Sequence, residues 1–274
     1  MNLTFIGGGN MAGAIIGGLV NGGANPREFR VVDPLPAQQD KLVGLYPGIG
    51  IFGEASVGAV EGADIVVLAV KPQQMRAAAR ALAPWLPDVP VIMSIAAGVR
   101  LADISRWLDG NPRLVRAMPN TPALIGEGIS GMFALPEAGA RGRKFAQRVL
   151  EGVGKVLWVI KEDMLDAVTG VSGSGPAYVF YFLESLEQAA QELGFSKEDA
   201  RTLAYATFSG TVKLAASSDL EPGILRAQVT SKNGTTERAI AVLETNAVKK
   251  HFMAAVKAAT ARAKEMGDAL SAEG

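Results

Sequence analysis

The sequence predicts an α/β domain built on a parallel sheet over residues 1–160, followed by an all-α domain over residues 161–274. Two observations carry this prediction. Short β-branched runs alternate with helical patterns through the first part of the chain, which is typical of a parallel sheet covered by helices on both faces. After about residue 160 the strand patterns nearly vanish and alanine-rich helical patterns replace them. The domain boundary rests on this change of pattern alone.

Composition narrows the class of protein. Lys plus Arg and Asp plus Glu both total 27 in 274 residues, so there is no net charge to attract nucleic acid or an anionic membrane, and we expect neither as a partner. Cysteine is absent, which excludes disulfides, thiol nucleophiles and thiolate metal sites. Apolar residues make up 49%, but no apolar run reaches a membrane-spanning length and no secretory leader is recognisable. We therefore expect a cytoplasmic protein.

The first strand-like run, Leu3–Ile6, ends in a glycine-rich turn, and a helical pattern follows at once. Read as G-x-G-x-x-A, the turn places Gly7 at the tight reversal and Gly9 where backbone approaches a pyrophosphate, while Ala12 lets helix and strand pack closely. Asp33 ends the next strand-like run, at the distance where this motif places a ribose-binding acid. The pattern indicates a Rossmann-type domain that binds a dinucleotide. The alternative is a glycine-rich turn without a ligand.

Three short segments follow expected strands, at the sheet edge where such domains bind ligands. They are Ala69–Pro72, Ser94–Gly98 and Arg116–Pro122. Taken singly, each reads as a strand end or a rigid turn. Together they place small, rigid and hydrogen-bonding groups along one edge, which suits a nicotinamide and its riboses, and we select Ala96 and Asn120 as candidate cofactor contacts. The expected strands are Leu3–Ile6, Arg30–Asp33, Ile65–Val70, Val89–Ser94, Leu114–Met118 and Val156–Ile160.

In the helical part, a long helix is expected from about Pro176 to a stop at Gly194. Ser196 begins a capping-box pattern for the next helix, Lys197–Ala216. The long helix carries an apolar stripe that is too apolar to face water, so we expect it to pack against a partner subunit; its residues are Val179, Leu183, Leu186, Ala190 and Leu193. Further helices are expected over Pro222–Val229, Thr236–Leu243 and Ala247–Met266.

Two segments rich in glycine and hydroxyls open helices in this part, Thr169–Pro176 and Val229–Thr236. The second offers hydroxyls, a cation and free backbone N–H groups at one helix N-terminus, which suits a carboxylate ligand. Ordinary helix capping is the alternative. The single histidine, His251, has no acidic or metal-binding neighbour in the sequence, and no acidic residues have ligand spacing, so we expect no metal site.

Taken in order, these segments resemble the Δ1-pyrroline-5-carboxylate reductase family, and the likeness runs nearly end to end. Its most specific part is the stretch Leu225–Glu244. The matching segments are Phe5–Ala12, Ala69–Pro72, Ser94–Gly98, Arg116–Pro122, Ser172–Ala177, Leu225–Thr236 and Ala239–Glu244. The resemblance implies reduction of a cyclic imine, 1-pyrroline-5-carboxylate, to L-proline by hydride from NADPH or NADH, the last step of proline biosynthesis. It also implies a helical dimerisation domain and a homodimer or an assembly of dimers.

The same resemblance implies site residues. The cradle for the substrate carboxylate and ring nitrogen is expected at Ser231, Asn233, Gly234, Thr235 and Thr236. Besides the glycine motif and Asp33, the implied cofactor contacts are Asn10, Met11, Val70, Lys71 and Pro72.

Two positions depart from the family pattern. Lys232-Asn233 stands where the family often has Pro-Gly; asparagine tolerates left-handed backbone, whereas the charge of Lys232 has no assigned role. Asp33-Pro34 stands where a small polar and a basic residue would accompany a 2′-phosphate. Asp33 would repel that phosphate but accept a bond from the 2′-hydroxyl of NADH. The family pattern favours NADPH and the residue chemistry favours NADH, so the sequence leaves the choice between NAD and NADP open.

Thr236 is the candidate catalytic residue. Hydride addition to a C=N carbon leaves electron density on nitrogen, and a proton or hydrogen-bond donor there stabilises the transition state. With His251 discounted, cysteine absent and no acidic pair, a hydroxyl is left, and the resemblance places Thr236 beside the ring nitrogen. Because a threonine hydroxyl is a weak acid, it would orient the protonated imine or relay a proton from water. The alternative is that Thr236 only caps its helix.

Two other functions are consistent with part of the pattern. A reductase of the β-hydroxyacid dehydrogenase kind would usually carry a lysine on the long helix, but after Pro176 no lysine occurs before Lys197. A non-catalytic protein that senses a dinucleotide would bind cofactor and turn over no imine.

Overall fold

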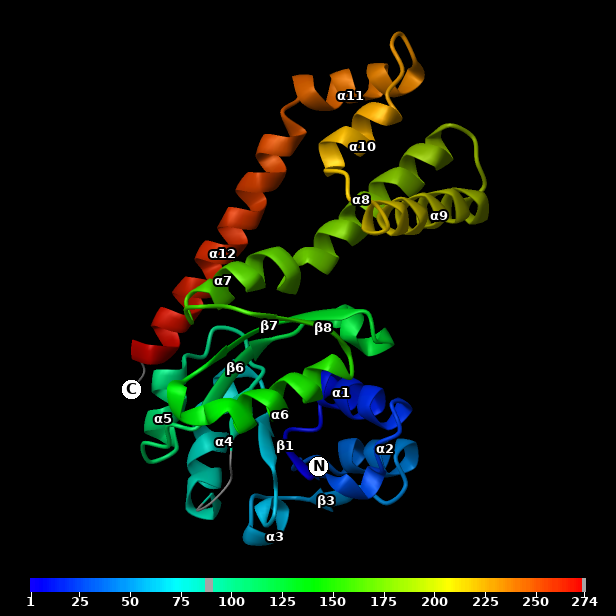
Figure 1. The fold of residues 1–274 in the computed structure, drawn as a ribbon. Helices are drawn as coiled ribbons and strands as arrows, with labels where there is room; N and C mark the ends of the chain where they lie inside the picture. The colour runs from blue at the N-terminus through cyan, green and yellow to red at the C-terminus, as the bar shows by residue number, and fades with distance from the viewer. Residues whose placement is uncertain (87–90, 273–274) are drawn as a thin grey trace. The chain divides into compact units, whose positions relative to one another are not determined.

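The computed structural model describes residues 1–86 and 91–272 (Figure 1). The chain forms two compact units, one made of Met1–Ser174 with Ala258–Gly274 and one of Gly175–Lys257. The last helix, α12 (Val248–Ala272), contributes residues to both units. The division after residue 160 that the sequence suggests stays a prediction.

The first unit is built on one eight-stranded sheet with the order β3-β2-β1-β4-β5-β6-β7-β8. Neighbouring strands are parallel except β6 and β7, which are antiparallel. The chain runs from β1 outward to β3 and then returns to β4 on the other side of β1, so the strand order reverses between β1 and β4. The strands are β1 Leu3–Ile6, β2 Phe29–Val32, β3 Gly50–Phe52, β4 Ile65–Leu68, β5 Ile92–Ser94, β6 Leu114–Met118, β7 Gly128–Ala134 and β8 Gly154–Trp158.

The expected α/β class is confirmed, with two strands added. β3 and β7 were not expected, and β7 makes the sheet mixed instead of wholly parallel. β7 contains two glycines and a serine, which give a weak strand pattern. A Cβ on Gly131 would lie 2.7 Å from Val168 Cγ1, so this strand needs glycine where a helix packs closely on it. Of the expected strand Val89–Ser94, residues 89 and 90 lie outside the described part.

Helices cover both faces of the sheet, as Figure 1 shows for the first unit. One core contains side chains such as Phe5, Val31 and Val67, packed under α1 (Asn10–Asn21), α2 (Pro36–Leu45) and α6 (Gly139–Glu151). The alternate residues of the strands, such as Ile6, Val32 and Leu68, pack under α3 (Val57–Val60), α4 (Met75–Leu82) and α5 (Leu101–Trp107). Two hydrophobic faces per strand explain the nearly continuous apolar runs of β1 and β4.

Five helices of the second part match the expected ones, although the last runs on to Ala272 instead of ending at Met266. The helices are α7 Met164–Val168, α8 Gly175–Glu192, α9 Lys197–Ala216, α10 Pro222–Gln228, α11 Thr235–Thr245 and α12 Val248–Ala272, with a π-helical turn at Thr169–Gly173. Helix α7 and the turn after it were not expected. Ser196 caps α9, because its Oγ accepts a hydrogen bond from the Asp199 N–H at 3.1 Å. Gly194 has φ +98°, the left-handed conformation expected for the residue that stops α8.

The apolar stripe of α8 is only partly covered within one chain. Leu183 and Ala190 are buried, whereas Val179, Leu186 and Leu193 are 47%, 37% and 80% exposed. The exposed members leave an apolar surface available for a partner. Within the described residues, no helix combines the length and the apolar character needed to cross a membrane.

Candidate functional site: the carboxyl edge of the sheet and the loop before α11

The glycine-rich turn joins β1 to α1 at the point where the strand order reverses. Gly7 has φ +97°, and a Cβ there would lie 2.9 Å from the Ala69 carbonyl oxygen at the end of β4. A Cβ on Gly9, in contrast, would meet no atom within 4 Å, so the backbone of Gly9 faces open space. Gly9 is the N-cap of α1 and no side chain caps this helix, which leaves its first N–H groups for a ligand. These features fit a pyrophosphate at the helix N-terminus.

Asp33 lies directly after β2 and is 8% exposed. Its Oδ2 accepts a hydrogen bond from the Gly8 N–H at 2.8 Å, and its Oδ1 accepts one from the Leu35 N–H at 3.0 Å. The structure therefore brings Asp33 and the glycine turn together, as the sequence motif requires. Asp33 also holds the turn in place, a role that the motif does not predict.

Two glutamines in the first turn of α2 complete the support of the glycine turn. The Gln38 amide donates to the Gly8 carbonyl oxygen, and the Gln39 amide donates to the Asp33 carbonyl oxygen at 2.6 Å. Gly8 is thus held through its N–H by Asp33 and through its C=O by Gln38. Neither glutamine was predicted from the sequence, because nothing in the sequence tells which turn of backbone a surface glutamine will reach.

The residues after β4 and β5 lie at the same edge as the glycine turn. Val70 contacts the turn closely, since its Cγ1 would lie 3.0 Å from a Cβ on Gly7. Lys71 is exposed and precedes a short 3₁₀ turn that begins at Pro72. Ala96 follows β5, is 6% exposed and donates its N–H to the Ser94 Oγ at 3.3 Å. The parallel register therefore gathers the cofactor candidates from three strand ends.

The side-chain amide of Asn120, which follows β6, forms hydrogen bonds to other parts of the chain. Its Nδ2 donates to the Ser172 carbonyl oxygen at 3.1 Å, and its Oδ1 accepts from the Ile129 N–H at 2.9 Å. The side chain is 9% exposed and joins three segments: the loop after β6, strand β7 and the Thr169–Gly173 turn. These bonds favour a role in shaping the sheet edge, and direct contact with a cofactor stays a prediction.

The candidate substrate segment, Ser231–Thr236, comprises the end of the loop between α10 and α11 and the first two residues of α11, all in the second unit. Asn233 has φ 60°, the left-handed backbone that asparagine tolerates. The Gly234 N–H donates to the Ser231 carbonyl oxygen at 3.0 Å, and a Cβ on Gly234 would collide with the Ser231 Oγ, which favours glycine there. The loop is therefore a tight turn whose shape depends on Asn233 and Gly234.

The helix after this loop begins at Thr235, one residue earlier than expected, with Gly234 as the N-cap and no side-chain cap. Thr236 is the second residue of α11 and half-buried, and in the described part of the chain its hydroxyl makes no hydrogen bond. Thr236 is therefore not the N-cap. The Glu237 carboxylate accepts from the Asn233 N–H at 2.7 Å and pins the loop to the helix.

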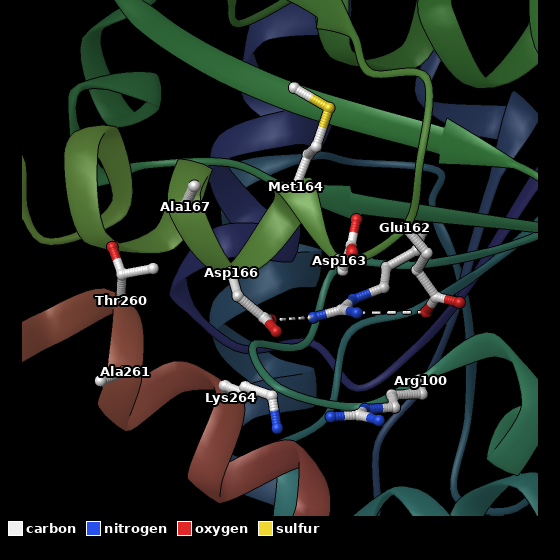
Figure 2. A pocket seen from close by; sticks show the side chains of 10 residues that line it. Arg100, Glu162, Asp163, Met164, Asp166, Ala167, Thr260, Ala261 and Lys264 are labelled. Carbon is white, nitrogen blue, oxygen red and sulfur yellow. Dashed lines mark hydrogen bonds and ion pairs between the residues drawn. The ribbon is translucent and has the colours of Figure 1, made fainter. Parts of the chain in front are cut away.

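A cavity of about 720 Å³ lies elsewhere in the first unit (Figure 2). It is lined by residues of α7 and α12 and by Arg100, which precedes α5. Arg116 of β6, 3% exposed, forms ion pairs there with Glu162 at 3.1 Å and Asp166 at 3.2 Å, shown by the dashed lines in Figure 2. Glu162 also accepts the Leu101 N–H at the start of α5. Arg116 is the first residue of the predicted edge segment Arg116–Pro122, but none of the individually selected site residues lines this cavity. We interpret its charges as a structural network that joins β6, α5 and the segment around α7.

Two titratable groups of the first unit have shifted pKa values. Burial raises the pKa of Tyr46, whose hydroxyl donates to the Gly13 carbonyl oxygen at 3.1 Å beside α1. A hydrogen bond from Lys264 lowers the pKa of Asp268 in α12.

His251 is exposed and borders an apolar cavity with Tyr178 and Phe252. Among the described residues, no three His, Cys, Asp or Glu side chains are placed to hold a metal ion.

Comparison with known proteins adds independent information. Residues 162–266 match the family model for pyrroline-5-carboxylate reductase dimerisation, and residues 2–98 match that for NADP oxidoreductase, coenzyme F420-dependent. The chain is 44% identical over 269 residues to a pyrroline-5-carboxylate reductase of Pseudomonas aeruginosa, covering 98% of this chain and 97% of that protein. It is 36% identical over 264 residues to the one from Arabidopsis thaliana, covering 96% and 94%.

Solved structures agree with this likeness. A pyrroline-5-carboxylate reductase from Coxiella burnetii superposes with a TM-score of 0.89 at 38% identity and covers 97% of this chain and 98% of that chain. A pyrroline carboxylate reductase from Plasmodium falciparum with NADP bound has a TM-score of 0.86 at 28% identity, with the same coverage of 97% and 98%. The likeness thus spans both units.

Proposed function

Because the chain belongs to the pyrroline-5-carboxylate reductase family, we propose that it reduces 1-pyrroline-5-carboxylate to L-proline with NADPH or NADH, the last step of proline biosynthesis. The observation that carries this function is the likeness over 98% of the chain, which includes both the dinucleotide edge and the helical loop. The protein is therefore an oxidoreductase that acts on a C–N bond.

The cofactor is proposed to lie along the carboxyl edge of the sheet. When bound, it supplies the hydride for the imine carbon. The uncapped N-terminus of α1 offers N–H groups of Asn10, Met11 and Ala12 to the pyrophosphate, and the bare backbone of Gly9 allows close approach. Val70, Lys71, Pro72 and Ala96 are proposed to line the remaining length of the same edge, with Asn120 shaping it.

The substrate carboxylate is proposed to bind at the N-terminus of α11. Ser231, Asn233 and Gly234 shape the turn. Within the described residues, no side chain caps α11, which leaves the N–H groups of its first turn for a ligand. The helix dipole adds about 0.3–1 kcal/mol for an anion there. A bound proline whose carboxylate lay far from residues 231–236 would contradict this placement.

Thr236 is proposed to assist at the ring nitrogen. When hydride reaches the imine carbon, the C=N π electrons move to nitrogen, and a donor near that atom stabilises the transition state. The Thr236 hydroxyl is not used by the helix cap and makes no other hydrogen bond in the described residues, so it is available to orient the protonated imine or to relay a proton from water.

Assembly completes the proposal. Residues 162–266 match the dimerisation model of the family, and α8 exposes apolar residues that a partner would bury. We assign residues 161–274 to dimerisation and substrate binding, residues 1–160 to dinucleotide binding, and the assembly to a homodimer or dimers of it. The cytoplasmic location and the absence of a nucleic-acid partner stay predictions.

One assay tests the function. Loss of NADPH and NADH absorbance is followed after addition of pyrroline-5-carboxylate, with proline identified as the product. A reductase of the β-hydroxyacid dehydrogenase kind would instead oxidise the cofactor with a carbonyl substrate. A sensing protein would bind cofactor and consume neither. Absence of imine turnover with both cofactors by a folded protein would overturn the proposal.

A further inference from the structure

We propose that the carboxyl ends of β2 and β3 make this reductase selective for NADH over NADPH, with Asp33 as the specificity-determining residue. The proposal rests on the proposed function, because it concerns the cofactor of the same site. The two cofactors differ by one phosphate on the adenosine ribose. In this fold, the residue after β2 and its neighbours contact that part of the ribose.

The segment after β2 holds an acid and no base. Asp33 is 8% exposed, and both of its oxygens accept backbone N–H groups, from Gly8 at 2.8 Å and from Leu35 at 3.0 Å. These two bonds hold a carboxylate at the end of β2. Residues 34–39 read Pro-Leu-Pro-Ala-Gln-Gln and contain no arginine or lysine that could neutralise a 2′-phosphate.

The polar groups of this segment are also already engaged. The Gln38 amide donates to the Gly8 carbonyl oxygen and the Gln39 amide to the Asp33 carbonyl oxygen. Both glutamines therefore hold the turn, and neither carries a charge. Pro34 and Pro36 have no N–H to offer.

The neighbouring strand end adds a second negative charge. The Asp33 N–H donates to the Phe52 carbonyl oxygen at 3.0 Å, so the ends of β2 and β3 lie side by side. The residues after β3 include exposed Glu54 and, like the segment after β2, no base before Val57.

The basic residues nearest in the chain occupy other positions. Arg30 of β2 donates to the Glu61 carbonyl oxygen at 2.5 Å. Lys41 of α2 lines a cavity of about 420 Å³ together with Gly9 of the glycine turn and Gln38, which supports that turn. Neither Asp33 nor Glu54 lines that cavity. A 2′-phosphate at the end of β2 would therefore face Asp33 and Glu54, whereas a 2′-hydroxyl can donate to the carboxylate. We expect repulsion between these charges to correspond to about a tenfold difference between the dissociation constants of NADPH and NADH.

The test measures binding of NADH and of NADPH to the protein without substrate, by isothermal titration calorimetry at low salt. We expect NADH to bind about tenfold tighter than NADPH. Leu35→Arg adds a cation at a 64% exposed position. It should lower the dissociation constant of NADPH about tenfold, while that of NADH changes less than about twofold. Val43→Arg, within α2 and 48% exposed, is the matched control and should change neither dissociation constant.

Two further variants test which negative charge disfavours NADPH binding. Glu54→Gln, at an exposed position, should tighten NADPH about twofold to threefold. Asp33→Asn should narrow the difference between the dissociation constants of NADH and NADPH further. Thermal melting of this variant shows whether it folds. A wild-type protein that binds NADPH as tightly as NADH overturns the inference, whether or not imine reduction is observed. An unchanged preference in Leu35→Arg and Glu54→Gln, both exposed positions, overturns the assignment to this edge.

Discussion

Thr236 shows how a weak chemical group can be made available by its neighbours. Gly234 serves as the N-cap of α11, and Glu237 holds the loop through the Asn233 N–H, so neither task falls on Thr236. A hydroxyl without a structural hydrogen bond in the described residues can be removed with little loss of stability. A loss of activity in a variant that lacks this hydroxyl therefore reports on catalysis and not on folding.

Thr236→Ala is expected to lower kcat/KM for the imine about tenfold or more, a loss of about 1.4 kcal/mol at the transition state. The dissociation constant of the cofactor should not change, because the residue lies in the candidate substrate segment. Thr236→Ser keeps the hydroxyl and should retain most of the activity. Steady-state kinetics check this, and an alanine variant with normal kcat/KM would reduce Thr236 to a helix residue.

Gly9 offers a second test at the scale of one residue. It has φ −62°, which any residue adopts, and a Cβ there would meet no protein atom within 4 Å. Gly9→Ala should therefore leave the melting temperature nearly unchanged, while the methyl group blocks the approach of the pyrophosphate. We expect both dinucleotides to bind at least about tenfold more weakly.

Calorimetry of Gly9→Ala and of Gly44→Ala gives the comparison. Gly44 lies in α2, and a Cβ added there would also meet no atom within 4 Å, so its alanine variant should bind both cofactors normally. Equal binding by the two variants would show that the pyrophosphate lies elsewhere.

At the scale of elements, α8 combines two roles along one apolar stripe. Leu183 and Ala190 are buried within the chain, where α8 packs on α9, and Leu186 is 37% exposed. The sequence predicted that the whole stripe packs against a partner subunit. The structure divides it, because α9 covers only part of the stripe.

Leu186→Glu is expected to shift the protein from its oligomer to monomers or aggregates, because a charge in an apolar interface is costly to desolvate. Gln188→Glu adds the same charge at an exposed position of the same helix and should leave the oligomer intact. Sedimentation velocity distinguishes the two. An unchanged profile for Leu186→Glu would remove this part of α8 from the interface.

At the scale of the whole molecule, Arg116 joins parts of the first unit that are far apart in the sequence. Its guanidinium pairs with Glu162 and Asp166, 46 and 50 residues away along the chain. Such a buried network adds little net stability compared with an apolar core but becomes costly when one partner is removed.

Arg116→Met should lower the free energy of unfolding by roughly 3–5 kcal/mol, because two partly buried carboxylates lose their cation. Arg141→Met is the matched control: its side chain is 75% exposed and lies 3.7 Å from Asp64, so a loss of about 0–1 kcal/mol is expected. Urea denaturation measures both. Similar losses for the two variants would show that the network is not a central support of the fold.

Much of the molecule could be predicted from the sequence because it depends on neighbours along the chain. The glycine turn, the N-cap at Ser196, the stop at Gly194 and the left-handed Asn233 each follow from the preferences of a few adjacent residues. The alternation of strands and helices likewise predicts the α/β class, since each period is local. The likeness to a known family extended these local predictions to substrate and chemistry.

Other features were decided only by tertiary contacts. β7 pairs antiparallel with β6 although its glycine-rich sequence is a poor strand pattern, and its Gly131 lies where Val168 leaves no room for a Cβ. The bonds of Asn120 to Ser172 and Ile129, and of Arg116 to Glu162 and Asp166, join residues that no short pattern associates. The amino-acid pattern alone thus predicted the fold class and the family, which are confirmed, whereas the site residues on the loops stay predictions. The direction of each buried polar side chain, including the Asp33 carboxylate that faces Gly8 and Leu35, was decided by the folded structure, because hydrogen-bond partners distant in sequence become neighbours only there.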